Sequence, residues 1–199
     1  MNMKKCINNA VLLSLLVLAA CVSTGRYQTK PMDAAVESIY TDLNAASCQK
    51  TIDPDDPNST PYQRCPGVSG YALALRHVGS GRQSIDVITP TQEVFPLDYH
   101  DVVTRHMTHV DDKAEWRAIM KNGIKTPFAL SIRIHAHENP DEPEQVTRTV
   151  IALAKITADE ICVTDTIPTG SLSSEEVRML ADSVRDRDCL TPLPELVSD

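Results

Sequence analysis

Six histidines are the side chains of this chain most suited to chemistry, and two of them, His135 and His137, stand two positions apart. On a β-strand alternate side chains point to one face, so these two imidazoles would lie together. Three more occupy a polar, aspartate-rich segment: His100, His106 and His109. Imidazole and carboxylate groups bind zinc and other late divalent metals. A metal site, and with it a metal-dependent enzyme, is one hypothesis if the two segments meet; solvated polar histidines are the alternative.

An acidic loop offers a second group of oxygen ligands, namely Asp53, Asp55, Asp56 and Asn58. The EF-hand calcium loop needs an oxygen ligand at its fifth position and glycine at its sixth. Counted from Asp53, Pro57 and Asn58 stand at those positions, so the pattern fails. A solvated surface loop is the interpretation that remains.

Signatures of hydrolases and nucleotide-binding enzymes are absent from the sequence. The segment 67–70, Gly-Val-Ser-Gly, lacks the spacing of the G-x-S-x-G elbow. The chain has no H-E-x-x-H, no P-loop and no G-x-G-x-x-G. We therefore expect a protein that is not an enzyme and that needs no cofactor.

Four cysteines follow the first 21 residues: Cys48, Cys65, Cys162 and Cys189. An even number in an oxidising compartment indicates two disulfides, for which three pairings can be drawn. We favour Cys48–Cys65 and Cys162–Cys189, because each pair is close in sequence and far from the other. A four-cysteine zinc site is the rival, but the sequence has no C-x-x-C pair.

The N-terminus has the parts of a secretory leader. Lys4 and Lys5 precede an apolar run over 10–20, which is shorter than the roughly 20 residues that span a bilayer. The run ends in Leu18-Ala19-Ala20-Cys21, which resembles the lipobox of bacterial lipoproteins. An ordinary leader with a chance cysteine and an uncleaved anchor are the alternatives.

The lipobox resemblance implies that residues 1–20 are a signal peptide and that Cys21 carries a diacylglycerol and an acylated amine. Two or more acyl chains such as palmitate hold a protein stably at a bilayer. Val22 stands where inner-membrane lipoproteins carry aspartate, so the chain resembles lipoproteins of the outer membrane. We expect residues 21–34 to tether a domain in the periplasm.

Charge limits the partners of the mature chain. The leader holds two basic and no acidic residues, which leaves 17 basic against 27 acidic residues and a net charge of −10. Nucleic acid is therefore not an expected partner, because binding phosphate needs a basic surface. The length suits one globular domain, which we place at 35–190, with a flexible tail at 191–199.

Alternating apolar residues predict several strands. Residues 70–78 and 82–89 flank Gly79-Ser80-Gly81 as a hairpin would. Further strands are expected at 94–97, 114–120, 127–137, 146–157 and 160–166. The spacing of Val36, Ile39, Tyr40 and Leu43 fits a short helix, although an extended conformation also fits.

A C-terminal helix is signalled by a capping box, Ser173 and Glu176, with Leu172 placed to contact Val177. Together these elements predict an α+β fold: an antiparallel sheet of five or six strands, a C-terminal helix packed on one face, and two disulfides.

The segment 63–71, Gln-Arg-Cys-Pro-Gly-Val-Ser-Gly-Tyr, with Ala114-Glu115-Trp116-Arg117 and Ile161-Cys162-Val163, resembles a group of small exported proteobacterial envelope proteins. That resemblance implies no activity. We expect a non-catalytic lipoprotein that binds another envelope component, protein or glycan. A more specific version is an inhibitor or immunity-type protein against a basic cell-wall hydrolase, since the negative charge would attract a cationic enzyme.

Overall fold

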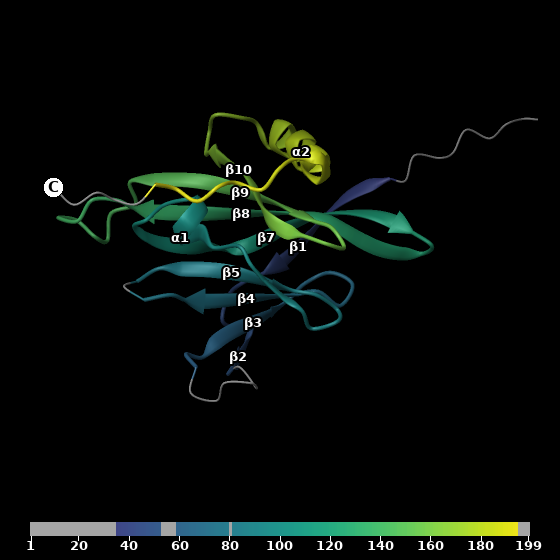
Figure 1. Ribbon diagram of the computed structural model, residues 1–199, viewed down its shortest axis with the longest axis horizontal. Helices are drawn as coiled ribbons and strands as arrows, with labels where there is room; N and C mark the ends of the chain where they lie inside the picture. Colours follow the sequence, from purple (N-terminus) through teal and green to yellow (C-terminus); the bar gives the residue numbers. More distant parts are fainter. Residues whose placement is uncertain (1–34, 53–58, 80, 195–199) are drawn as a thin grey trace, which may run out of the picture. The chain divides into compact units, whose positions relative to one another are not determined.

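The computed structural model describes residues 35–52, 59–79 and 81–194, which form two five-stranded antiparallel sheets (Figure 1). The first sheet consists, in spatial order, of β1 (Val36–Asp42), β7 (Met107–Lys121), β8 (Ile124–His137), β9 (Arg148–Ile156) and β10 (Ile161–Pro168). The second consists of β2 (Gln49–Thr51), β3 (Tyr62–Pro66), β4 (Ala72–His77), β5 (Gln83–Ile88) and β6 (Val94–Pro96). The helices are α1 (Tyr99–Val102) and α2 (Ser174–Ser183), and a 3₁₀ turn, Val184–Asp186, follows α2.

The two sheets pack face to face around the main hydrophobic core. Alternate residues of β4 and β5, such as Leu73 and Ile85, are fully buried, as are Trp116, Leu130 and Ile132 on the facing strands. Burying each large apolar side chain contributes about 1.5–3 kcal/mol. The predicted hairpin over 70–89 is confirmed as β4 and β5.

β7 and β8 form one long hairpin whose turn is Asn122-Gly123. Both turn residues have positive φ (52° and 78°), as a type I′ turn requires. Phe128 is an extra residue in this hairpin, because Ala118 pairs with Pro127 while Arg117 pairs with Ala129. Strict alternation along the strand expected at 127–137 would place Phe128 on the same face as Leu130. That placement is wrong, because the bulge turns the Phe128 ring to the opposite face, under α2.

The segment that fits either a helix or a strand, Val36–Asp42, is the strand β1. It pairs antiparallel with β7 along its whole length, from Val36 opposite Ile119 to Asp42 opposite Lys113. Leu43, just beyond it, is buried. The pattern of these seven residues fits both a helix and a strand, so pairing with the distant strand β7 determines that the segment is extended.

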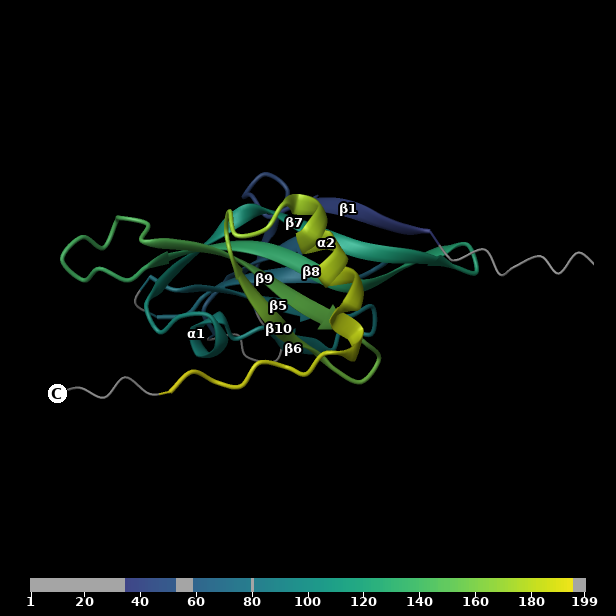
Figure 2. The same ribbon diagram turned by 90° about the horizontal axis from the view of Figure 1, so that it is seen from above.

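The C-terminal helix α2 lies on the outer face of the first sheet, as Figure 2 shows from above. The predicted capping box is present: the Ser173 hydroxyl accepts from the Glu176 amide, and the Glu176 carboxylate accepts from the Ser173 amide. Val177 and Ala181 pack with Phe128 in a second apolar cluster.

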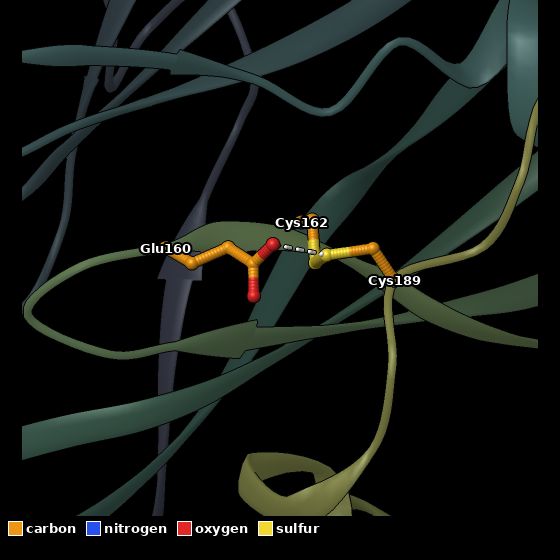
Figure 3. A group of neighbouring side chains, drawn as sticks. All are labelled: Glu160, Cys162 and Cys189. Atoms are coloured by element: carbon orange, nitrogen blue, oxygen red, sulfur yellow. Dashed lines mark hydrogen bonds between the residues drawn. A yellow bond between two sulfur atoms is a disulfide. The ribbon is translucent and has the colours of Figure 1, made fainter.

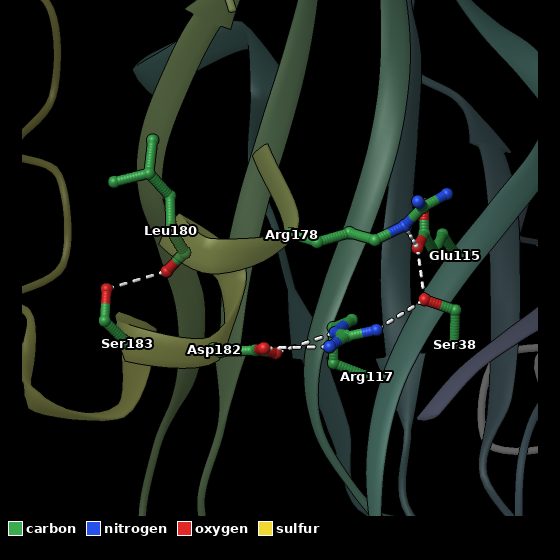
Figure 4. Close-up of polar contacts among 7 residues, drawn as sticks. All are labelled: Ser38, Glu115, Arg117, Arg178, Leu180, Asp182 and Ser183. Atoms are coloured by element: carbon green, nitrogen blue, oxygen red, sulfur yellow. Dashed lines mark hydrogen bonds and ion pairs between the residues drawn. The ribbon is translucent and has the colours of Figure 1, made fainter. Parts of the chain in front are cut away.

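Polar contacts fix the other side of α2 to the sheet (Figure 4). Arg117 donates two hydrogen bonds to the Asp182 carboxylate, at 2.7 and 2.8 Å. Arg117 also donates to Ser38, which donates to Glu115. Glu115 accepts from Arg178 at 2.7 Å. These charges therefore serve to hold the helix on β1 and β7.

Both favoured disulfides are present, Cys48–Cys65 and Cys162–Cys189. The predicted class is confirmed: antiparallel sheet, C-terminal helix on one face and two bridges, with a second five-stranded sheet beneath the first. Beyond the second bridge, the Leu193 amide donates to the carbonyl of Asp101 in α1. No helix within the described residues combines the length and the apolar content that crossing a bilayer would require.

Candidate functional site

The pairing of β7 with β8 brings the two histidine segments together at the end of the hairpin remote from its turn. His109 stands directly opposite His135, and Met107 opposite His137. The His109 and His135 rings stack with centroids 6.2 Å apart and planes inclined by 28°. Cross-strand partners share a face, so these four side chains form one patch on the sheet.

A cavity of about 500 Å³ opens beside this patch. The second sheet and the β8–β9 loop complete its wall, and its principal lining side chains are His77, Gln83, Met107, His109, His135, His137, Glu144 and Val146. Four of the six histidines of the chain therefore face one space. We call this space the histidine pocket.

The second sheet is fixed to the pocket by Gln83 at the start of β5. Its side-chain carbonyl accepts from the Val110 amide at 2.8 Å. Its backbone amide donates to the Thr108 hydroxyl at 3.0 Å, and the same hydroxyl donates back to its carbonyl at 2.8 Å. These bonds bring His77, the residue paired with Gln83, to the pocket. Sequence reasoning missed His77, since no local pattern shows which strand ends meet.

His135 is held in place from β9. Its Nδ1 lies 3.0 Å from the Thr149 hydroxyl. Burial lowers the pKa of the His135 imidazole, the Asp111 carboxylate opposes that shift, and neighbouring His109 adds to it. The ring is therefore held toward its neutral form, in which one nitrogen donates and the other accepts.

His137 lies between the histidine pocket and an adjoining cavity of about 270 Å³ that includes His106. Its buried Nδ1 has no hydrogen-bond partner among the described residues. Buried polar atoms are ordinarily paired, so this nitrogen is free to bond a ligand or a water. His137 and Met107 line both cavities, whereas His106 lines the smaller one alone.

His100 takes a different position, on α1. Its Nε2 lies 3.4 Å from an Arg82 guanidinium nitrogen. Burial lowers the pKa of the His100 ring, and the charges of Arg82 and Arg105 lower it further. His100 does not line the histidine pocket.

The β8–β9 loop, residues 138–147, closes one side of the pocket and is fixed at its base. Glu138 accepts from Arg148 at 2.8 Å and from Thr104 at 3.0 Å. The hydrogen bond from Arg148 holds the pKa of the Glu138 carboxyl below its usual range, although partial burial opposes it.

Among the described residues, no group of three possible metal ligands gathers around the stacked histidines. Within residues 35–52, 59–79 and 81–194, the ligand atoms of three His, Cys, Asp or Glu residues come within 4.8 Å of one another in one group: Glu160, Cys162 and Cys189. Its two sulfurs are joined as a disulfide, and the Cys189 Sγ lies 2.9 Å from the Glu160 carboxylate (Figure 3). A disulfide sulfur is not the thiolate that binds metal, and Glu160 already pairs with Lys155 at 2.5 Å.

Two sets of predicted residues lie outside the described part of the chain. Cys21, with the leader and tether, belongs to residues 1–34, and the acidic loop from Asp53 to Asn58 belongs to 53–58.

Comparison of the chain with models of protein families, with functionally characterised proteins and with solved structures found no match. The histidine pocket and the polar contacts around it are therefore the basis for assigning a function.

Proposed function

We propose that this chain is a lipid-anchored protein of the bacterial envelope whose domain binds another envelope component in the histidine pocket. The lipobox at Cys21 supports the anchor, and Val22 supports the outer membrane as its location. The observation that carries the binding role is the cavity of about 500 Å³ onto which four imidazoles converge. A concave site with a few converging polar groups is the usual form of a ligand site.

The chemistry of the pocket suits a ligand rich in hydroxyl or amide groups, such as a glycan or a peptide segment. Each neutral imidazole offers one donor and one acceptor. The stacked rings of His109 and His135 provide a flat surface, and Met107 and Val146 add apolar contact. These groups can hydrogen-bond a polar ligand and pack against its apolar parts.

Binding rather than catalysis is supported by the surroundings of His135. Its hydrogen-bond partner is a threonine hydroxyl, Thr149. Nucleophilic catalysis also needs a group that orients the base through its second nitrogen. Among the described residues no carboxylate forms a hydrogen bond with His135.

A photo-crosslinking experiment in cells tests the binding role. A diazirine amino acid replaces Val146, which lines the pocket and is 47% exposed; the matched control replaces Val94, which is 44% exposed on the edge strand β6. We expect a discrete protein or glycan adduct from position 146 alone, and its loss when His109→Ala and His135→Ala are added. Identical adducts from both positions, or adducts that survive the histidine changes, would count against a ligand in the pocket.

A second candidate, inhibition of a basic cell-wall hydrolase, is favoured by the mature net charge of −10. Complementary charge accelerates association, and the gain declines with added salt. We expect the purified protein to slow a cationic muramidase at low ionic strength and less at high ionic strength. Unchanged muramidase rates at low salt would eliminate this candidate and leave the general binding role intact.

A further inference from the structure

Three exposed apolar side chains lie close together at the tip of the β7–β8 hairpin. Ile124, directly after the turn, is 62% exposed; Met120, before it, is 46% exposed; and Val36, at the start of β1, is 41% exposed. Val36 pairs with Ile119, so the start of β1 lies beside the tip. These residues, together with Lys121 and the turn, are here called the hairpin tip.

Each face of the hairpin tip carries at least one exposed apolar side chain. Val36 pairs with Ile119 and shares its face of the sheet. Ile124 lies on the same face, because it pairs with Lys121, two positions after Ile119. Met120 lies on the opposite face, where its partner is Lys125. An apolar surface that merely covers the protein core would need one face, whereas exposure on both faces suits a tip that enters an apolar medium.

The start of β1 connects the hairpin tip to the N-terminal part of the chain. β1 begins at Val36, fifteen positions after Cys21. That length of chain spans at most roughly 50 Å. In both ribbon views the start of β1 and the β7–β8 turn lie at the same end of the first sheet (Figures 1 and 2). An anchor at Cys21 would therefore connect to the described domain at the end that holds the hairpin tip.

We propose that the hairpin tip inserts into the surface of the phospholipid bilayer that holds the anchor, an inference that rests on the proposed lipidation of Cys21. Ile124, Met120 and Val36 enter the boundary between headgroups and acyl chains. Lys121 and Lys125 flank them, and long lysine side chains extend their charges to the headgroups while their stems stay in apolar surroundings. Lys125 is paired with Glu37 at 3.1 Å, so this surface carries little of the negative charge of the domain.

Insertion of the hairpin tip would fix the orientation of the binding site. The histidine pocket lies at the other end of β7, a strand of fifteen residues. At about 3.4 Å a residue, β7 is roughly 50 Å long. The pocket would thus be held away from the membrane rather than against it.

Tryptophan quenching by brominated lipid tests this contact. The full lipidated chain, purified and reconstituted in vesicles of phosphatidylethanolamine and phosphatidylglycerol with an acyl-brominated lipid, carries Ile124→Trp. The matched variant is Val146→Trp, an exposed apolar site in the β8–β9 loop, which follows the end of β8 remote from the hairpin tip. The native Trp116 is buried in the core and gives the same background in both proteins. Urea unfolding of each variant confirms that it folds.

We expect the tryptophan at 124 to lose most of its added emission while the tryptophan at 146 loses none, with both proteins floating with the vesicles. Flotation without quenching at 124, or equal quenching at both positions, would overturn membrane insertion and leave the lipid anchor intact. A protein that does not float with the vesicles would refute the anchor itself, and the insertion with it.

Discussion

Removing the Cys162–Cys189 disulfide should weaken the domain by a predictable amount. The bridge joins β10 to the segment after α2, so it closes a loop that contains the whole C-terminal helix. Both cysteines are only partly buried, and replacing them by alanine therefore opens no core cavity. The change acts mainly on the unfolded chain.

The chain-entropy relation gives the size of the effect. For a separation of 27 residues the cross-link removes unfolded-state entropy worth about 3.5 kcal/mol at 25 °C. The Cys48–Cys65 loop, with a separation of 17, gives about 3.1 kcal/mol. Cys65 is 1% exposed, so its truncation also loses packing worth about 1 kcal/mol. The first bridge should therefore cost slightly more to remove, although its loop is shorter.

Urea unfolding under non-reducing conditions measures both losses, with emission of the single tryptophan, Trp116, as the probe. For C162A/C189A we expect the free energy of unfolding to fall by about 3.5 kcal/mol. We also expect a steeper dependence on urea, since an unfolded chain without the bridge exposes more surface. A loss under about 1 kcal/mol, or an unchanged urea dependence, would refute the unfolded-state explanation.

Three further changes test the packing and the pocket. Gly67→Ala places a Cβ 2.7 Å from a backbone carbonyl oxygen and 3.0 Å from the Trp116 ring, so we expect urea titration to show a loss of about 1–3 kcal/mol. Glu138→Gln should destabilise the protein at pH 7 and much less below the usual glutamate pKa of about 4.3. Arg148 depresses the pKa of the Glu138 carboxyl in the folded protein, so the stability that this carboxylate contributes is lost as the pH falls. Melting temperatures measured from pH 7 to 3 would contradict this if the variant showed the same deficit at every pH. The pKa of His135 is also lower in the folded protein, so below about pH 6.5 the unfolded chain binds more protons and the free energy of unfolding decreases. His135→Gln should make this decrease smaller. The same dependence of stability on pH in the variant and the natural protein would contradict the prediction.

Local patterns determined much of this fold in advance. Alternation predicted β4, β5 and β8, and the Ser173–Glu176 capping box predicted α2. These signals are readable because each depends on residues within a few positions of one another. The division of the strands between two sheets could not be predicted, because alternation shows that one face of a strand is buried but not which element covers that face.

The sequence predicted one part of the histidine pocket but not the other. The shared face of His135 and His137 follows from strand geometry, and the structure has it. The stacking of His109 on His135 depends on a bulge in which residues 111–113 of β7 lie opposite the single residue Arg133. No residue in that bulge has a distinctive turn chemistry, so the register could not be counted from the sequence.

The β8–β9 loop allows the mouth of the histidine pocket to vary while the positions of the histidines stay fixed. The register of β7 with β8 is fixed by the Asn122-Gly123 turn and the bulges, so an inserted residue within either strand would shift the histidines relative to one another. The 138–147 loop lies outside that register, anchored at its base by the Arg148–Glu138 pair. Its length can change without moving a strand. Gain and loss of loop residues would therefore reshape the mouth of the pocket while the imidazoles stay in place, which gives this scaffold a route to new ligands that costs the core nothing.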